Sequence, residues 1–520
     1  MALTFTRRAA QELQDRLAAL CPGRDGGPTV TTFHGLGLRI LREHHEAAGL
    51  PPRFTVADEA VRLEVAAGLT GSERDARRLV ARLAEDPDGK LALRRELAAR
   101  DLVDFDGLVE MSADLLRDHP AVAAGLRARW PNVSVDEYQD IDPVQYGLLR
   151  LIGGDGTGLT AIGDPDQSIY RFRGADVGIF GRFAADFPGA TSVELTRNYR
   201  SNPAIVTAAT QAIAPDTLVP GRTAVAARGG PADVVTLDEL ADEHAEAAWI
   251  AAAIDKLLGG ASFHSLDSGR ADGHEHGKLG LADIAVLYRT DAQAGPLSQA
   301  LTRAGLPFQK RSHDRLARRP GVADVLREMR LVNPGPAGDV AERLAAAVRA
   351  LAADRGEQGA TVTDIRAAAE LLTPLARRCG ADLERFRAEI SLGAETDALD
   401  ARAEAITLLT LHGAKGLEFD MVFLAGCERG LLPLWRPGSG PVTAADAAEE
   451  RRLLFVGMTR ARERLLLTCA ARRTRHGSTE ASGRSAFLAA LDPPPPGLTA
   501  PGLTGPRRAR RAGDRQLRLL

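Results

Sequence analysis

With 520 residues, of which 44% are hydrophobic and 26% charged, the chain has the size of three or four domains and the composition of a globular protein. Its four cysteines are widely spaced without a CxxC pair, no apolar run is long enough to span a membrane, and the N-terminal residues lack the apolar stretch of a signal peptide. These features argue against a zinc site, a disulfide framework and a membrane protein, and they favour a cytoplasmic one, while the net charge of −3 leaves a nucleic-acid partner open because binding needs a basic groove rather than a basic total.

Residues 1–210 alternate helical patterns with short apolar runs. Two of these runs, Val133–Val135 and Leu159–Ile162, are followed at once by acidic or Gly-Asp turns. Strands that alternate with helices predict a parallel α/β sheet, and ligand-binding groups gather at the carboxyl ends of such strands. Residues 40–130 are rich in Ala, Arg, Leu and Glu and predict a helical insertion in this first core.

The second half of the chain shows the same organisation. Its strand-like runs are Ile284–Tyr288, Met421–Ala425 and Arg464–Thr468. A helical stretch at about 318–402 lies between them. We therefore expect two α/β cores, at residues 1–210 and 211–480, each with a helical insertion. Residues 490–520 are rich in Pro, Gly and Arg, a composition that predicts a disordered basic tail.

The first motif with chemical content follows the run Val133–Val135 and reads DEYQD, residues 136–140. A first carboxylate at such a place can hold Mg²⁺, which prefers a few hard oxygen ligands and keeps several waters. A second carboxylate can orient or deprotonate an attacking water. A bare Asp-Glu pair would be read more simply as a solvated acidic turn, but the next motif argues against that interpretation.

That next motif is GDPDQSIYRFRGA, residues 163–175, which places an amide, two aromatic rings and two arginines within seven residues. Gln167 is suited to sense a γ-phosphate, and the rings of Tyr170 and Phe172 are suited to stack on bases, an interaction that tolerates any base sequence. For Tyr170, packing in a core is an equally good interpretation.

These two motifs resemble motifs II and III of the UvrD/Rep/PcrA-like superfamily 1A DNA helicases, and further family motifs follow in order. They are LTFTRRAA at 3–10 (Ia), TFHG at 32–35 (Ib), DFD at 104–106, LTRNYRS at 195–201 (IV), TLHGAKGLEF at 410–419 (V) and EERRLLFVGMTRA at 449–461 (VI). The resemblance implies two RecA-like cores and an ATP-dependent 3′–5′ DNA helicase or translocase. Such an enzyme couples ATP hydrolysis, with Mg²⁺, to movement on single-stranded DNA and to unwinding of partly duplex DNA in repair or recombination. It also implies a bacterial, nucleoid-associated location.

The resemblance also assigns roles in nucleotide chemistry. The side chains expected to act in catalysis are Asp136, Glu137, Gln167, Arg200 and Arg460. Asp136 would hold Mg²⁺, while Arg200 and Arg460 would reach the γ-phosphate, a task that suits a permanently charged guanidinium. Tyr199 would stack on the adenine ring and Glu418 would bind the nucleotide sugar. Surface salt bridges are the alternative for the arginines.

A second set of side chains would contact DNA. It consists of Thr6, Phe33, His34, Tyr170, Phe172, Arg173 and His412. For His34 and His412, a hydrogen-bonded structural role is the alternative interpretation.

The chain departs from the family at the phosphate-binding loop. The family carries G-x-G-K-[ST] before motif Ia, whereas here neither Gly-Lys pair, Gly89-Lys90 or Gly277-Lys278, is followed by Ser or Thr. That loop holds the phosphates and Mg²⁺, so we expect these 520 residues to be inactive alone, with a first core that lacks a strand and is unstable. Either Met1 is a wrongly assigned start or the chain is a piece of a longer or split enzyme, or else the chain is a non-catalytic DNA-binding or regulatory relative. We favour the first interpretation because the other catalytic residue types are present.

Two smaller features concern the insertion and the tail. The second insertion, at about 318–402, is short for the family. The tail ends in Gln516–Leu520, which resembles the QLxLF peptide that docks on the bacterial sliding clamp; a random tail is the alternative. The arginines at 507, 508, 510 and 511 are also suited to grip DNA phosphates.

Overall fold

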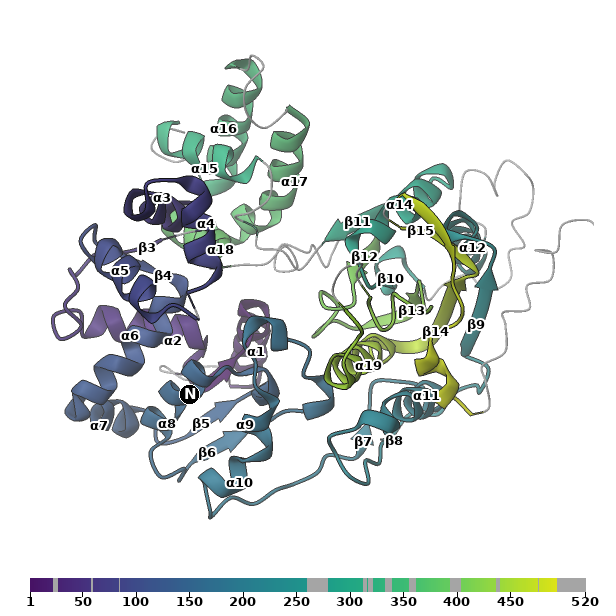
Figure 1. The fold of residues 1–520 in the computed structure, drawn as a ribbon, viewed down its shortest axis with the longest axis horizontal. Coiled ribbons are helices and arrows are strands. Elements are labelled where there is room, and N and C mark those ends of the chain that lie inside the picture. The colour runs from purple at the N-terminus through teal and green to yellow at the C-terminus, as the bar shows by residue number, and fades with distance from the viewer. Residues whose placement is uncertain are drawn as a thin grey trace, which may run out of the picture.

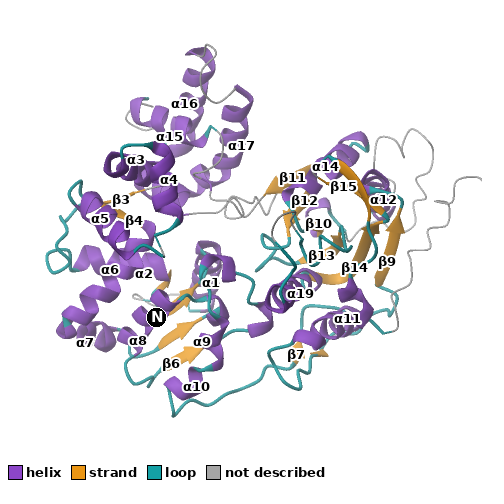
Figure 2. Cartoon of the chain, in the orientation of Figure 1, coloured by secondary structure: helices purple, strands orange, loops and turns teal. Residues whose placement is uncertain are grey.

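The computed structural model describes residues 1–21, 27–57, 59–83, 85–259, 279–311, 316, 321–332, 339–354, 362–392, 404–435, 440–475 and 477–492. Within these ranges the chain forms two α/β cores and two smaller, mainly helical parts (Figures 1 and 2). The tail segment Gln516–Leu520 and the arginines at 507–511 lie outside the described residues.

The first core is built on a four-stranded parallel sheet in the order β2-β1-β5-β6. Its strands are β1 (Ala2–Thr4), β2 (Val30–Thr32), β5 (Val133–Val135) and β6 (Leu159–Ala161). Its helices are α1 (Arg7–Leu20), α2 (Phe33–Glu43), α6 (Phe105–Asp118), α7 (Pro120–Arg129), α8 (Pro143–Gly153), α9 (Val177–Gly181) and α10 (Phe183–Asp186). Leu3 and Val135 of the sheet pack with Leu36, Leu108 and Leu148 of the helices in one buried cluster, which removes apolar surface from water.

One edge of this sheet is unusually open. The first and last residues of β5, Val133 and Val135, are buried, whereas none of the three residues of β6 is buried. Ile162, directly after β6, is 47% exposed. Among the described strands β6 pairs on one side only, with β5. Strands of a parallel sheet are normally covered on both faces, so the exposed apolar surface beside β6 is unusual.

The first insertion differs in detail from the helical stretch expected at 40–130. It contains α3 (Glu59–Thr70), α4 (Glu73–Ala81) and α5 (Pro87–Ala98), but also a parallel pair of short strands, β3 (Thr55–Ala57) and β4 (Leu102–Asp104). These elements have a small hydrophobic cluster of their own. Helices α6 and α7, also within 40–130, pack instead into the cluster of the first core.

The second core has a six-stranded parallel sheet in the order β11-β12-β10-β13-β14-β9. The strands are β9 (Val235–Leu240), β10 (Ile284–Tyr288), β11 (Phe308–Arg311), β12 (Ile406–Thr410), β13 (Phe419–Leu424) and β14 (Ala461–Ala470). Successive residues of β10 enter two clusters: Ala285 and Leu287 pack with one, and Ile284 and Val286 with the other. Because side chains alternate along a strand, both faces of this sheet are buried.

Four helices cover the two faces of this sheet. Helices α11 (Pro203–Ile213) and α19 (Ala444–Met458) pack on one face, and α12 (Glu243–Leu257) and α14 (Ala294–Arg303) on the other. Most of α11 was expected in the first core, which the sequence placed at 1–210, but Ile205 and Ala209 are buried in the second. The chain therefore crosses between the cores before α11.

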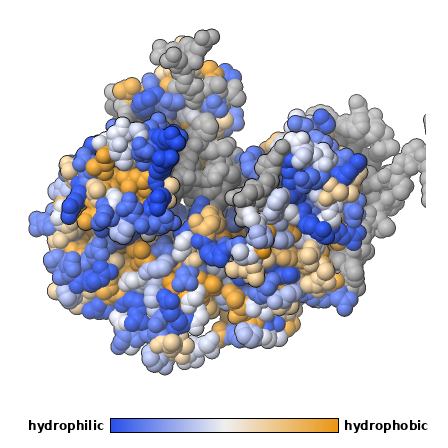
Figure 3. Space-filling model, viewed as in Figure 1, coloured by the Kyte–Doolittle hydropathy of each residue, from blue (hydrophilic) through white to orange (hydrophobic). Residues whose placement is uncertain are grey.

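The remaining elements are peripheral to the two sheets. The second insertion consists of α15 (Val322–Leu331), α16 (Val340–Asp354), α17 (Val362–Cys379) and α18 (Leu383–Leu392), which share one cluster. Two further strand pairs are β7 (Arg197–Asn198) with β8 (Val225–Ala226), and β15 (Arg472–Arg475) with β16 (Ser478–Ala481). Among the helices described, none combines the length and the apolar character needed to cross a membrane. On the face shown in Figure 3 hydrophilic and hydrophobic residues are mixed, and hydrophobic patches lie on the lobe that contains α2 and α6 and also on the lobe of the second core.

Candidate nucleotide and DNA site

The acidic pair follows β5, as the sequence predicted. Glu137 has φ 54° and ψ 40°, a left-handed conformation that is costly for a residue with a side chain and that is often found at functional sites. The Asp136 carboxylate accepts a hydrogen bond from the Glu137 backbone N–H at 3.0 Å. Partial burial, followed by the charge of Glu137, raises the pKa of Asp136.

The neighbouring turn, residues 163–168, is tied to this pair by Gln139. The Gln139 side-chain amide donates to Glu137, and its oxygen accepts the backbone N–H of Asp164 at 3.0 Å. A Cβ at Gly163 would stand 2.3 Å from that amide oxygen, so a side chain there would displace the Gln139 amide. In the same turn Gln167 Nε2 donates to Asp164 Oδ2 at 3.0 Å. The sequence analysis named Gln167 and Glu137 but missed the Gln139 side chain that connects their turns.

A lysine of the second core contacts the acidic residues that follow β5 in the first core. Lys415, in the loop after β12, is 5% exposed at its side chain; it binds the buried Asp140 carboxylate and lies 3.4 Å from Glu137. Its Nζ also donates to the Gln167 carbonyl at 2.7 Å. Burial raises the pKa of Asp140 to about 7, although Lys415 opposes that shift. Sequence reasoning missed Lys415; its charge within the otherwise uncharged stretch HGAKG was the available signal.

Arg460 reaches the same place from the end of α19. Its Nη2 donates to Gln167 Oε1 at 3.4 Å and to Thr459 Oγ1 at 3.0 Å, and the rest of its guanidinium donates to backbone carbonyls of the second core. Burial, followed by the nearby charge of Arg200, lowers the pKa of Arg460 to about 10. The group therefore remains a cation at neutral pH, and it faces the first core.

Arg200 and Glu418, which were both expected to bind the nucleotide, form an ion pair with each other. The Arg200 guanidinium binds Glu418, whose carboxylate also accepts from Arg462 at 3.0 Å. Burial would raise the pKa of Glu418, but the two guanidiniums outweigh it and lower that pKa. Tyr199 beside them is 68% exposed, with the Arg197 guanidinium 5.6 Å from its ring centre. The ring expected to stack on adenine is thus open to solvent.

Aromatic rings from both cores form a continuous row. Phe5 stacks on Tyr170 at 5.1 Å between ring centres, Tyr170 meets Phe172 edge-on at 6.1 Å, and Phe172 meets His412 edge-on at 5.3 Å. The Arg173 guanidinium lies 5.6 Å from the rings of both Tyr170 and Phe172. Phe172 is 64% exposed, whereas Tyr170 is 2% exposed. Burial favours the packing interpretation for Tyr170, and the row adds Phe5, which the sequence analysis did not name.

The other three expected DNA residues have structural contacts at the first core. Thr6 caps α1 by accepting the Ala9 backbone N–H at 3.1 Å. Phe33 is 3% exposed and belongs to the hydrophobic cluster. His34 stacks on Phe105 at 3.6 Å. The burial of Phe33 favours a core role over the contact with DNA that the sequence predicted.

The carboxylates are compatible with Mg²⁺ but do not form a complete metal site. Within the described ranges, no group of three or more His, Cys, Asp or Glu side chains is arranged to hold a metal ion. Magnesium is commonly held by one or two carboxylates together with phosphate oxygens and water. Asp136 and Glu137 match the protein share of that set.

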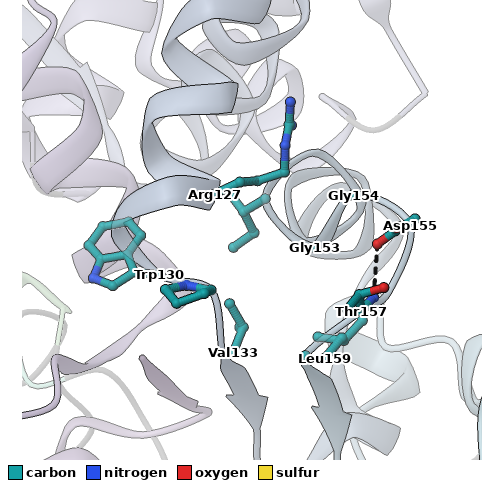
Figure 4. A pocket seen from close by; sticks show the side chains of 11 residues that line it. Arg127, Trp130, Val133, Gly153, Gly154, Asp155, Thr157 and Leu159 are labelled. Atoms are coloured by element: carbon teal, nitrogen blue, oxygen red, sulfur yellow. Dashed lines mark hydrogen bonds between the residues drawn. The ribbon is translucent and has the colours of Figure 1, made fainter.

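A separate cavity of about 640 Å³ lies at the opposite end of the strands (Figure 4). It is lined by the amino ends of β5 and β6 and by the ends of α7 and α8, with Arg127, Trp130 and Leu159 among its residues. The groups described above follow the carboxyl ends of β5 and β6, where ligands bind in parallel sheets. This cavity is therefore not part of the candidate site.

Known proteins resemble the chain over nearly its whole length. Residues 1–91 and 90–188 match the UvrD/REP helicase N-terminal domain, and residues 193–335 and 342–472 match the UvrD-like helicase C-terminal domain. The ATP-dependent DNA helicase UvrD2 of Mycobacterium tuberculosis (strain ATCC 25618 / H37Rv) is 32% identical over 570 residues, covering 99% of this chain and 78% of that protein. DNA helicase II of Escherichia coli (strain K12) is 28% identical, with 94% and 80% covered, and the ATP-dependent DNA helicase PcrA of Leuconostoc citreum is 28% identical, with 95% and 78% covered.

Proposed function

The chain belongs to the UvrD/REP helicase family, and from that premise we propose that it forms the motor of an ATP-dependent 3′–5′ DNA helicase or translocase. The proposed substrates are single-stranded and partly duplex DNA in bacterial repair or recombination, in the cytoplasm at the nucleoid. One observation carries the proposal: Glu137 and Gln167 of the first core meet Lys415 and Arg460 of the second. A sliding clamp that accepts Gln516–Leu520 is a further proposed partner.

Each core contributes its own part of the nucleotide site. ATP with Mg²⁺ supplies the phosphoanhydride bond whose cleavage drives movement. Asp136 would hold the Mg²⁺ ion, and the Glu137 carboxylate would orient the attacking water. Arg460 and Arg200 would neutralise charge on the γ-phosphate, and for this Arg200 would have to release Glu418. The carboxylates belong to the first core and the arginines to the second. Binding and release of nucleotide would therefore change the position of one core relative to the other.

The aromatic row supplies the DNA grip, and Phe172 is its most exposed ring. Replacing Phe172 by Ala is expected to weaken binding of an oligothymidine by about 5- to 150-fold, since stacking contributes about 1–3 kcal/mol per base. Fluorescence anisotropy without nucleotide measures this. Tyr199→Ala is the matched control, because Tyr199 is equally exposed but is assigned to adenine; it should keep the wild-type affinity. Equal losses in both variants would contradict the assignment of Phe172.

The open edge of β6 bears on activity. Residues 1–520 contain no Gly-Lys-Ser or Gly-Lys-Thr sequence. Within the part of the chain that the structure describes, β6 pairs with β5 alone, and Ile162 beside it is exposed. We propose that ATP hydrolysis requires a phosphate-binding strand and loop, supplied from outside these residues, that pairs with β6. The alternative is a DNA-binding or regulatory protein that does not hydrolyse ATP.

A phosphate-release assay with single-stranded DNA distinguishes these proposals. Residues 1–520 are expected to show no activity above an Asp136→Ala/Glu137→Ala control, because the phosphates lack their backbone cradle. A form extended by a phosphate-binding segment should hydrolyse ATP if the chain is a motor, and should remain inactive if it is the non-catalytic relative. DNA-stimulated turnover by residues 1–520 alone, lost in the double variant, would refute the need for that segment.

A further inference from the structure

The turn at residues 164–168 of the first core is a meeting point of cations from the second. Within the described part of the chain, four such side chains contact it: Arg222, Lys415, Arg452 and Arg460. Lys415 and Arg452 bind backbone carbonyls of the turn, at 2.7 Å and 2.9 Å. Arg460 touches only the Gln167 side chain, at 3.4 Å. Arg222 binds the carboxylates of the turn, and neither the motifs nor the proposed mechanism gives it a role.

Arg222 makes the most extensive of these contacts. Its guanidinium is bidentate to Asp164, with one Nη1–Oδ1 distance of 2.8 Å, and Nη1 also lies 2.9 Å from Asp166 Oδ2. The Asp166 side chain is fully buried and also accepts from Thr217 Oγ1 at 2.6 Å and from the Leu218 backbone N–H at 2.7 Å. Two parallel N–H···O bonds fix orientation as well as distance, so the turn has a defined position against this segment.

The segment that carries Arg222 is attached to the second core by two contacts. Asp216, six residues before Arg222, pairs with Arg451 of α19 at 2.5 Å. The Arg222 guanidinium itself lies 4.9 Å from the ring of Phe455, which is buried in the second core's cluster. Arg222 is therefore a fixed point of the second core that grips the first.

Asp164, the main partner of Arg222, is also hydrogen-bonded to side chains of the candidate nucleotide site. The Asp164 carboxylate accepts from Gln167 Nε2 at 3.0 Å, and the Asp164 backbone N–H donates to Gln139, which in turn holds Glu137. Burial would raise the pKa of Asp164, but the hydrogen bonds and charge of Arg222 lower it. The pair is thus ionised near neutral pH, and its hold on the turn does not depend on protonation.

We propose that Arg222 is a positioning residue, which holds Asp164 and Asp166 in place. Gln167 and the aromatic residues that follow it then keep their positions while the contact of Arg460 with the turn changes. The inference rests on the proposed function. The contrast between the two arginines supports it, because Arg222 makes three ionic contacts where Arg460 makes one long hydrogen bond to the same turn. Arg222 then keeps a constant contact between the cores, whereas Arg460 can exchange its single hydrogen bond with the turn for a contact with phosphate.

The test uses residues 1–520 and needs no ATP hydrolysis. Arg222→Met keeps the length of the side chain but removes the fork, and Arg222→Lys keeps the charge. The control is Arg289→Met, which removes an equally buried bidentate pair, with Glu450, lying wholly in the second core. The readouts are hydrogen–deuterium exchange of peptides spanning residues 164–173, oligothymidine affinity, and thermal unfolding.

Arg222→Met should speed exchange across residues 164–173 and weaken oligothymidine binding about 2- to 30-fold, which corresponds to the 0.5–2 kcal/mol typical of residues that couple two sites. Arg222→Lys should restore part of the affinity, and Arg289→Met should lower the unfolding temperature without changing affinity. If wild type binds and Arg222→Met matches it in exchange and affinity, the positioning role is wrong while the proposed function stands. If wild type itself does not bind single-stranded DNA, the proposed function fails. Should Arg222→Met not fold, Asp164→Asn weakens the same clamp from the first core and gives the same comparison.

Discussion

Replacing Arg460 by Ala is expected to lower DNA-stimulated ATP hydrolysis about 10³- to 10⁵-fold, the range for loss of an arginine finger, in a form that includes a phosphate-binding segment. Arg460 is the one guanidinium, among the described residues, that contacts Gln167 across the cores. It is buried, and its pKa of about 10 keeps it charged at neutral pH, so it can neutralise phosphate charge without taking up a proton. Phosphate release at saturating single-stranded DNA measures the loss.

The matched control is Arg464→Ala, four residues along in β14, because Arg464 is exposed and has no role in the proposal. It should leave turnover within about twofold of wild type, as surface substitutions change little. Arg460 also donates to the carbonyls of Val456 and Leu417, so unfolding must be measured alongside. A folded Arg460→Ala protein with normal turnover would show that the proposed clamp across the cores does not act on the phosphate.

The sequence predicted several of the strands whose residues are mainly apolar. Val133–Val135 and Ile284–Tyr288 are strands over the same residues in the structure, because short apolar runs between turn signals are typical of buried parallel strands. The pair β3–β4 was missed, because these two three-residue strands lie within a stretch whose Ala, Arg, Leu and Glu content predicts helices. The placement of α11 was also missed: an amphipathic pattern shows that a helix has a buried face but not which core buries it.

The candidate site was predictable where a motif specifies it locally. Glu137, Gln167 and Arg460 were named from sequence, and the structure brings them to one place, through Lys415 and through the bond between Arg460 and Gln167. Lys415 and Arg222 were not named, because their partners are 275 and 58 residues away in the chain and only folding shows the pairing. Phe33 and Tyr170 illustrate the opposite difficulty: an aromatic residue in a motif does not reveal whether its ring is exposed.

Replacing Lys415 by Met is expected to destabilise the folded protein by about 3–5 kcal/mol, the cost of leaving one partner of a buried ion pair uncompensated. Asp140 is fully buried, and its Oδ1 atom has no hydrogen-bond partner among the described residues. Without the ammonium group, a carboxylate would remain with little solvation between the two cores, or would take up a proton. Since whole proteins unfold at a cost of about 5–15 kcal/mol, the change should be plain in urea unfolding followed by circular dichroism.

The double variant Lys415→Met/Asp140→Asn tests whether the loss of stability comes from the unpaired carboxylate of Asp140 or from the altered packing at position 415. With no buried charge to strand, it should recover about half or more of the loss, because replacing both partners of a buried pair is often nearly neutral. Lys310→Met, which removes an exposed pair with Asp291, should cost no more than about 1 kcal/mol. If Lys415→Met unfolds at the same urea concentration as Lys310→Met, the cores are not held together through Asp140.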